Sequence, residues 1–197
     1  GLKEVYHYLA SGAVKGVGKA TARLLVEEFG EEALNVIEEE PDKLTRIRGI
    51  SPKRARTISN AFRQQMGMRR MMELAMPLYR TYGDVALEAV RSNPYLLSGW
   101  EFGVDFSQAD ALALELGVEG EAPLRREAGL LFELDHNLNN GHSFLPAGKL
   151  VAATGQLLSV PEERLEESLD TLERRGEIVR EEIAGEIRDA LLPALKG

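Results

Sequence analysis

The chain has no cysteine among its 197 residues. This absence excludes disulfide bonds, cysteine nucleophiles and cysteine-ligated zinc, and it fits the reducing cytoplasm, where we expect the protein to be located. No apolar run approaches the roughly 20 residues that a membrane-spanning helix needs, so no membrane partner is expected. The three histidines, His7, His136 and His142, lack the spacing with carboxylates that is typical of metal sites. No metal or other cofactor is therefore expected in this chain.

Signatures of catalysis are also missing. Carboxylates are abundant, but no pair flanks a recognisable cleft in the sequence, so an acid–base enzyme has no support. Residues 12–21 resemble a phosphate-binding loop, but Ala13 and Ala20 stand where that motif requires glycine and Ser or Thr. We expect no catalytic residue here. No secretory signal is present, and the sequence opens at Gly1 in an already helical pattern, as an excised piece of a longer protein would.

A glycine followed by an aliphatic residue recurs three times, at Gly16-Val17, Gly49-Ile50 and Gly103-Val104. Each glycine is followed by an alanine after six residues, an aliphatic residue after nine and a large apolar residue after thirteen. These are Ala22, Ala55 and Ala109; Leu25, Ile58 and Leu112; and Phe29, Phe62 and Leu116. The spacing places them on one helix face, where the alanine permits a second helix to approach closely. Three copies of a hairpin turn followed by a helix are predicted.

The repeat extends beyond the hairpins. Residues between 29 and 44 recur at a constant offset of 53 residues: Phe29-Gly30, Ala33-Leu34, Ile37, Pro41 and Leu44 correspond to Tyr82-Gly83, Ala86-Leu87, Val90, Pro94 and Leu97. The third hairpin therefore belongs to a longer duplicated segment.

The helix after the second hairpin is expected to reach about Arg70, and Pro77 is expected to interrupt the helical segment that follows. All five methionines lie here, and we interpret them as adaptable core residues rather than as a promiscuous binding surface: Met66, Met68, Met71, Met72 and Met76. Near the third hairpin, Tyr95 and Trp100 are interpreted as apolar anchors of the repeat rather than as residues that stack on bases.

Positive charge is concentrated around the second hairpin. Residues 41–70 hold nine cations against one anion, whereas residues 157–192 hold five cations against eleven anions. The contrast indicates one basic face on a chain whose net charge is −8, although a solvated charged helix face is the plainer alternative.

The hairpins are suited to binding phosphate. Gly49 permits a tight turn, Ile50 is an apolar plug, and Pro52 suits the first turn of a helix. A helix N-terminus presents unpaired N–H groups at the positive end of its dipole. We therefore predict that N–H groups of residues 16–19 and 49–53 contact DNA phosphates without reading bases. The predicted DNA-binding residues are Lys15, Gly16, Val17, Gly18, Lys19, Arg48, Gly49, Ile50, Ser51, Lys53, Arg54 and Arg56.

The third hairpin has different chemistry. Asp105 stands where the second hairpin has Ser51, and Gln108 stands where it has Arg54. Because an acidic turn repels phosphate, we interpret this copy as mainly structural, or as one that contacts bases or protein.

After Gly117 the composition shifts, and residues 119–123 are predicted to be a linker. Helix 124–139, a short strand at 143–145, helices 146–158 and 161–176 and a strand at 177–180 follow in the order of a winged helix-turn-helix domain, which binds DNA or protein. The second of the consecutive helices is strongly acidic, which argues against insertion into the major groove. We favour a packing role or contact with a protein partner.

The Gly-Val-Gly turn at residues 16–18, with its trailing alanine and aliphatic residue, resembles the helix-hairpin-helix DNA-binding motif. The larger combination resembles the region ahead of the motor domains in RecD-like DNA helicases, relatives of the exodeoxyribonuclease V alpha subunit. It comprises residues 14–49, 82–95, 141–146 and 172–179, so the resemblance covers nearly the whole chain. Ser51 departs from the family by replacing the second turn glycine, and the segment between Met72 and Tyr79 is shorter than usual.

The expected fold is mainly α, with tandem helix-hairpin-helix repeats followed by a winged-helix-like domain with a small β-ribbon. Residues 1–70 are assigned to paired helix-hairpin-helix motifs, 71–118 to a third such repeat and 119–197 to the winged-helix-like domain.

The resemblance implies a parent enzyme that hydrolyses ATP with Mg and moves 5′ to 3′ on single-stranded DNA, in repair and recombination. Its motor domains are expected after Gly197, so this piece would not turn over ATP. Expected partners are single-stranded or forked DNA, those motor domains and a protein bound by the winged-helix-like domain. Two alternatives stay open: a scaffold that docks against motor domains or a partner, and an accessory module of a DNA-repair nuclease.

Overall fold

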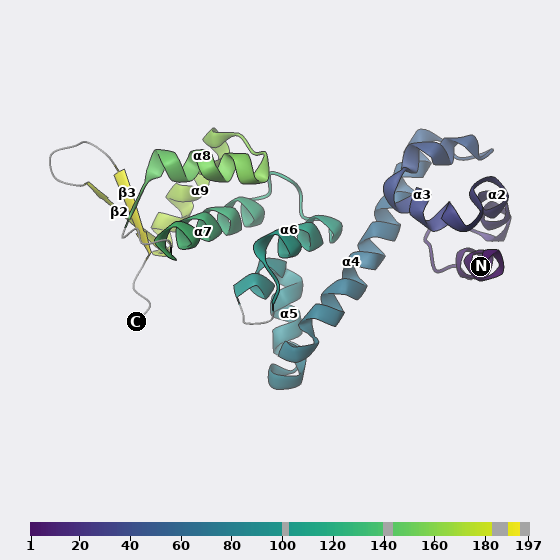
Figure 1. Cartoon of the computed structure of the whole chain (residues 1–197), viewed down its shortest axis with the longest axis horizontal. Coiled ribbons are helices and arrows are strands. Elements are labelled where there is room, and N and C mark those ends of the chain that lie inside the picture. Colours follow the sequence, from purple (N-terminus) through teal and green to yellow (C-terminus); the bar gives the residue numbers. More distant parts are fainter. Residues whose placement is uncertain (100–102, 140–143, 183–188, 194–197) are drawn as a thin grey trace. The chain divides into compact units, whose positions relative to one another are not determined.

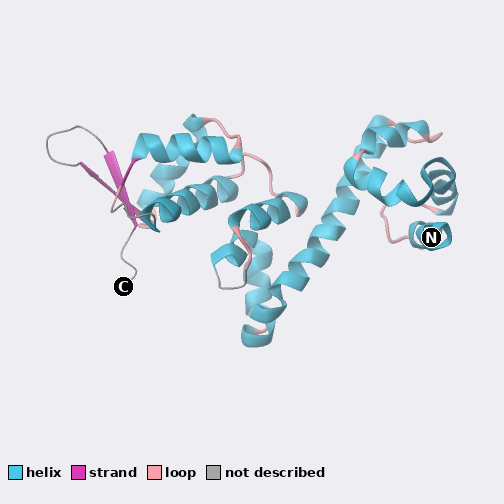
Figure 2. Ribbon diagram, viewed as in Figure 1, coloured by secondary structure: helices cyan, strands magenta, loops and turns pink. Residues whose placement is uncertain are grey.

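The computed structural model describes residues 1–99, 103–139, 144–182 and 189–193. The fold is mainly α, as predicted, with a small antiparallel sheet formed near the C-terminus (Figure 2). Contacts between residues group the chain into two compact units, unit 1 (Gly1–Gly83) and unit 2 (Asp84–Gly197). Their boundary is not one of the boundaries assigned from the sequence, and the functional division into 1–70, 71–118 and 119–197 stays a prediction.

Unit 1 begins with two helices joined by the first hairpin. α1 (Leu2–Ala10) leads through the turn to α2 (Lys19–Phe29), and Gly30 ends α2 with a φ of +59°. η1 (Gly30–Glu32), α3 (Ala33–Glu39) and η2 (Pro41–Arg46) then lead to the second hairpin and to α4 (Pro52–Tyr82) (Figure 1). The expected helix end at Gly30 is confirmed.

The aligned apolar positions of the first two copies meet in one core. Ala22 and Leu25 of α2 are buried in the same cluster as Ala55 and Ile58 of α4. Burying an aliphatic side chain of this size contributes roughly 1.5–3 kcal/mol before the entropy of ordering it is subtracted. The two hairpin turns that precede α2 and α4 are therefore carried by one packed module.

α4 is a single helix of 31 residues. The predicted interruption at Pro77 is wrong. Met71, Ala75 and Leu78 are buried at helical spacing on both sides of the proline, so packing continues the helix although Pro77 lacks an N–H group. The interpretation of the methionines as core residues holds for Met71, which is buried, and is wrong for Met72 and Met76, which are 48% and 38% exposed. None of the described helices, α4 included, is long and apolar enough to cross a membrane.

Unit 2 begins with the second half of the duplication. α5 (Asp84–Ser92) and η3 (Pro94–Gly99) repeat α3 and η2, and α6 (Phe106–Glu115) follows the third hairpin. Val90 and Leu97 are buried, as are their counterparts Ile37 and Leu44. Tyr95 is buried too, which confirms its interpretation as an anchor, whereas Trp100 lies outside the described residues.

The rest of unit 2 has the predicted order of elements. α7 (Pro123–Asn139), β1 (Leu145–Pro146), α8 (Ala147–Leu158), α9 (Glu162–Arg174) and β2 (Ile178–Glu182) are followed by β3 (Asp189–Pro193). The strands are antiparallel in the order β1–β3–β2, with Leu145 and Arg180 both paired to Leu191. The assignment of this segment to a winged-helix-like domain stays a prediction. Residues 141–143 of the expected resemblance, with His142, lie outside the described residues.

Candidate nucleic-acid interface

The first two hairpins have the same backbone. Gly16 and Gly49 adopt φ values of +89° and +92°, which an L side chain rarely tolerates. The N–H group of Val17 donates to the carbonyl of Val14 at 3.1 Å, and the N–H group of Ile50 donates to the carbonyl of Ile47, also at 3.1 Å. The side chains of Val17 and Ile50 are buried in the core of unit 1 and hold each turn in place. The glycine of each turn stays exposed.

The first hairpin ends in an uncapped helix N-terminus. Gly18 is the N-cap of α2 and has no side chain to accept a hydrogen bond. The first helical hydrogen bond runs from the N–H group of Ala22 to the carbonyl of Gly18 at 2.8 Å. The N–H groups of Lys19, Ala20 and Thr21 therefore point out of the helix end with no intrahelical acceptor, as anion binding requires.

The second hairpin offers fewer N–H groups. Ser51 is the N-cap of α4, and its Oγ accepts from the N–H group of Arg54 at 3.1 Å. Pro52 has no N–H group, so Lys53 supplies the one open donor of the first turn. Val17 and Ile50, both predicted DNA-binding residues, use their N–H groups within the turns, so of residues 16–19 and 49–53 the remaining donors are those of the glycines, Ser51 and the lysines.

The third hairpin repeats the turn, but a capping box forms at the N-terminus of the helix that follows it. Gly103 has a φ of +74°, and Val104 is buried. Asp105 accepts from the N–H group of Gln108 at 2.8 Å, while Gln108 Oε1 accepts from the N–H group of Asp105 at 3.0 Å. This capping box satisfies the N–H groups of Asp105 and Gln108, the second of which is equivalent to the Thr21 N–H group that the first hairpin leaves open, and it places a carboxylate at the helix end. Its geometry agrees with the interpretation of this copy as mainly structural.

The cations of the first two hairpins are exposed. Among the described residues, the following predicted DNA-binding cations have no ion-pair partner: Lys15, Lys19, Arg48, Lys53 and Arg56. Some other cations of unit 1 have partners within the fold. Lys43 pairs with Glu40 at 2.9 Å, Arg63 donates to the carbonyl of Glu38, and Arg70 lies 3.9 Å from the Glu38 carboxylate. Both hairpins therefore carry exposed cations without an ion-pair partner in the described part of the chain.

Arg54 occupies a different position from the other predicted cations. Its Nη1 donates to the carbonyl of Gly49 at 3.0 Å, and its Nη2 donates to the carbonyl of Gly16 at 3.1 Å and lies 3.5 Å from Thr21 Oγ1. The side chain therefore lies between the two turns and contacts both. The sequence placed Arg54 on one hairpin only, because nothing in the spacing shows that the first turn comes within its reach.

The third hairpin is also held by an arginine. Arg125 of α7 donates to both carboxylate oxygens of Asp110, at 2.9 and 3.0 Å, and to the carbonyls of Gly120 and Leu158. The hydroxyl of Tyr95 donates to Asp110 at 2.6 Å. Burial raises the pKa of the Tyr95 phenol, and the hydrogen bond to Asp110 raises it further.

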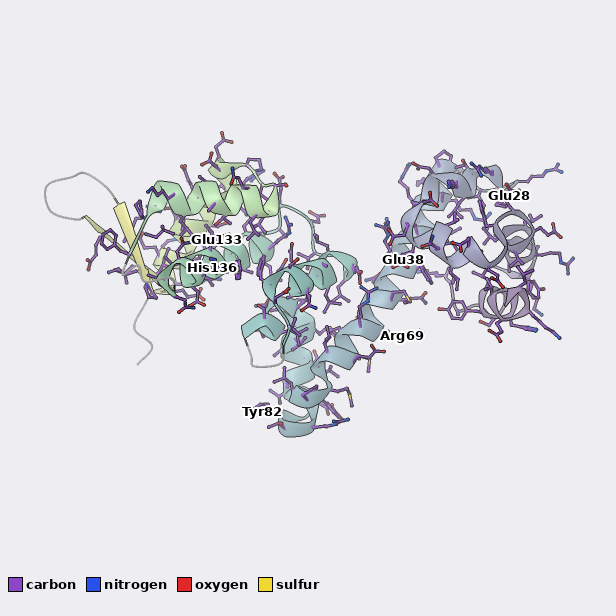
Figure 3. All side chains as sticks on the ribbon, in the orientation of Figure 1. Glu28, Glu38, Arg69, Tyr82, Glu133 and His136 are labelled. Atoms are coloured by element: carbon purple, nitrogen blue, oxygen red, sulfur yellow. The ribbon has the colours of Figure 1, made fainter. Side chains whose placement is uncertain are left out.

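Aromatic rings continue the contact between the third hairpin helix and α7. The ring of Phe106 stacks on those of Tyr95 and Phe132, at 5.6 and 4.7 Å between centroids. Phe132 stacks on His136, which Figure 3 shows on α7. α6 is therefore fastened into the core of unit 2 by both polar and aromatic contacts.

The two units differ in charge. Unit 1 has 14 Lys and Arg against 10 Asp and Glu, a net charge of +4, whereas unit 2 has 10 against 22, a net charge of −12. No group of three or more metal-ligating side chains is found in the described parts of the chain. The arrangement in unit 1 can bind an anion through main-chain donors and lysines.

Two family models match the chain. Residues 9–64 match the SAM-like helix-hairpin-helix tandem, and residues 60–144 match the helix-hairpin-helix domain of the ATP-dependent RecD2 DNA helicase. Residues 9–144 therefore form a helix-hairpin-helix region that is similar to that of RecD-like helicases. An ATP-dependent RecD2 DNA helicase of Deinococcus radiodurans is 27% identical over 147 residues, which cover 69% of this chain and 20% of the helicase. The chain thus corresponds to about one fifth of the length of this RecD2 relative. In the RecD-like region, the first two hairpins fall mainly within the tandem match and the third within the RecD2 match.

Proposed function

We propose that unit 1 binds DNA without sequence specificity, through phosphate contacts of its first two hairpins. The open N-terminus of α2, with Lys15 and Lys19 beside it, is the observation that carries this proposal. Main-chain N–H groups and lysines recognise phosphate oxygens, which every sequence presents alike. The relation to RecD2 helicases supports a place for this region beside the motor of an ATP-dependent 5′–3′ helicase, whose motor domains would bind ATP and Mg.

Binding is tested by fluorescence anisotropy of the whole chain with labelled single-stranded, duplex and forked DNA at two salt concentrations. The expected result is binding that weakens steeply with salt, because each phosphate contact releases counterions. Absence of binding to all three at low salt would overturn the proposal.

Charge-reversal variants test whether the two hairpins are the DNA-binding site. Lys19→Glu and Lys53→Glu together remove one exposed cation from each hairpin. On single-stranded DNA the slope of log K against log salt should become shallower by about 1.4, since each contact contributes about 0.7. Lys149→Glu, at an exposed lysine of α8 in unit 2, is the matched control for each single variant, Lys19→Glu and Lys53→Glu. Equal losses in the control and the single variants would show that net charge, not the hairpins, governs binding.

Unit 2 favours a second role. Its net charge of −12 and the acidic α9 oppose close approach to a phosphate backbone. We propose that unit 2 contacts protein, either the motor domains of the parent or a separate partner. Cross-linking of the whole parent protein would test this, with cross-links from α9 to another domain or protein as the expected result. A nuclease accessory role would be favoured instead if the parent gene encoded no ATP-binding motor.

A further inference from the structure

We infer that Arg54 is a positioning residue that fixes the spacing of the two hairpin turns, so that they engage DNA as a single site. This inference rests on the proposed DNA binding by unit 1. It assigns to Arg54 a role other than the phosphate contact expected from its place in the basic segment.

The contacts of the guanidinium group carry the inference. Nη1 and Nη2 donate to the carbonyls of Gly49 and Gly16 at 3.0 and 3.1 Å. These carbonyls belong to the two glycines with φ near +90°, which form the tips of the turns. One planar group therefore connects the two segments that would touch phosphate, although 38 residues separate Arg54 from Gly16.

The internal repeat explains why one arginine serves both turns. Gly16 and Gly49 are equivalent positions 33 residues apart, and the same offset relates Thr21 to Arg54. The Arg54 Nη2 atom lies 3.5 Å from Thr21 Oγ1, so the two equivalent positions face each other. A large side chain at one position and a small one at the other fit this space, whereas two arginines would repel each other.

The chemistry favours arginine here over any other cation. The guanidinium holds its donors in a rigid fork and can reach two acceptors at once, whereas the ammonium of lysine is a single point on a flexible stem. Carbonyl acceptors do not neutralise the charge, and Arg54 has no ion-pair partner among the described residues. The Arg54 bridge therefore adds a positive charge next to the two turns and also fixes the distance between them.

Among the described residues, no arginine bridges the turn of the third hairpin to another turn. Gln108 occupies the position of Arg54, and its side chain closes the capping box of its own helix. Gln108 therefore does not join the third turn to another turn, as Arg54 joins Gly49 to Gly16. The bridge is a property of the pair in unit 1.

The consequence for binding is an increase in effective concentration. When one turn holds a phosphate, a fixed partner turn is already placed for another, and binding gains without any new contact. Loosening the bridge should weaken DNA binding even if every cation is kept.

The test compares Arg54→Lys, which keeps the charge, with Arg23→Lys as the matched control, since Arg23 of α2 is exposed, is not one of the predicted DNA-binding residues and has no described partner. Arg54→Lys should weaken DNA binding about tenfold and make its salt dependence shallower, because the turns no longer act together. Arg23→Lys should change affinity less than twofold. Wild-type affinity and salt slope in Arg54→Lys would overturn the inference. Thermal melting of each variant checks that the fold is retained.

A second measurement does not depend on DNA. Nitroxide labels on Lys15→Cys and Arg48→Cys report the distance between the turns, and no other cysteine competes for the label. Electron paramagnetic resonance should give a narrow distance distribution with Arg54 and a broad one with Arg54→Lys. An unchanged distance distribution would overturn the inference that Arg54 fixes the spacing of the turns. If the wild-type chain binds no DNA but the distribution broadens, the proposed function fails and the bridge stands.

Discussion

The first two hairpins in unit 1 and the third in unit 2 share a positive-φ glycine, a buried aliphatic residue and an extended residue at the helix N-cap. They differ in what happens to the polar groups at the helix end. In α2 the N–H groups of the first turn stay open, in α4 Ser51 accepts from one of them, and in α6 a capping box satisfies those of Asp105 and Gln108 and adds a carboxylate. In the proposed function, the same backbone turn serves either as an anion-binding site or as a structural joint, depending on the residue at the N-cap.

The two bridging arginines differ in the same sense. Arg54 is exposed and bonds to carbonyls, so its charge remains available to a ligand. Arg125 is 7% exposed and pairs with a carboxylate, so its charge is neutralised inside the fold. An exposed bridge contributes little to stability, whereas removing one partner of a buried ion pair costs several kcal/mol. We therefore expect Arg54 to contribute mainly to ligand binding and Arg125 mainly to the stability of the fold.

The largest effect is expected at the buried bridge. Arg125→Met should lower the free energy of unfolding of unit 2 by about 3 kcal/mol, because it leaves the Asp110 carboxylate without its cation. Amide hydrogen exchange should show loss of protection in α6 and α7 and unchanged protection in α2. Arg54→Met, the equivalent change in unit 1, should cost less than about 1 kcal/mol. Similar losses in both variants would remove the distinction between the two arginines.

A smaller effect separates the turns. Gly16→Ala and Gly103→Ala each place a side chain at positive φ, at a cost of about 1–2 kcal/mol. A Cβ at Gly16 would also lie 3.2 Å from Ile58 Cγ1, whereas nothing lies within 4 Å at Gly103. Gly16→Ala should therefore weaken DNA binding about tenfold, comparable to one or two lost phosphate contacts, and Gly103→Ala less than twofold. Anisotropy titrations check both, and equal weakening would place the third turn on the DNA.

Much of this contrast could be predicted from the sequence. The spacing of glycine, alanine and aliphatic residues located all three turns and the apolar face of their helices, because helical periodicity fixes which residues face the core. Asp105 indicated the different chemistry of the third hairpin. The order of elements in residues 119–182 followed from the alternation of turn residues and apolar periodicity.

Other features depend on contacts between distant segments. The bridge of Arg54 to Gly16 and the pairing of Asp110 with Arg125 join parts of the chain that no local pattern relates. Pro77 was expected to interrupt the helix because a proline lacks the N–H group, but buried neighbours at helical spacing decided otherwise. Tertiary packing overrides local preference at such positions.

The smallest effect tests whether the acid or the cap makes the third hairpin different. Asp105→Ser introduces the residue that the second hairpin has, and it keeps a side chain that caps the helix. Stability should change by less than about 0.5 kcal/mol, since Ser and Asp are similar N-caps, while Asp105→Ala should cost about 1 kcal/mol. Thermal unfolding measures both changes.

Neither variant should change DNA affinity more than twofold, because α6 is held inside unit 2 by Asp110, Phe106 and their partners. A fivefold or greater gain in Asp105→Ser, with a steeper salt dependence, would mean that only the carboxylate keeps the third turn from phosphate. The turn would then be a DNA contact inactivated by a single charge, and the difference between the two units would rest on electrostatics and not on how each hairpin is built into its core.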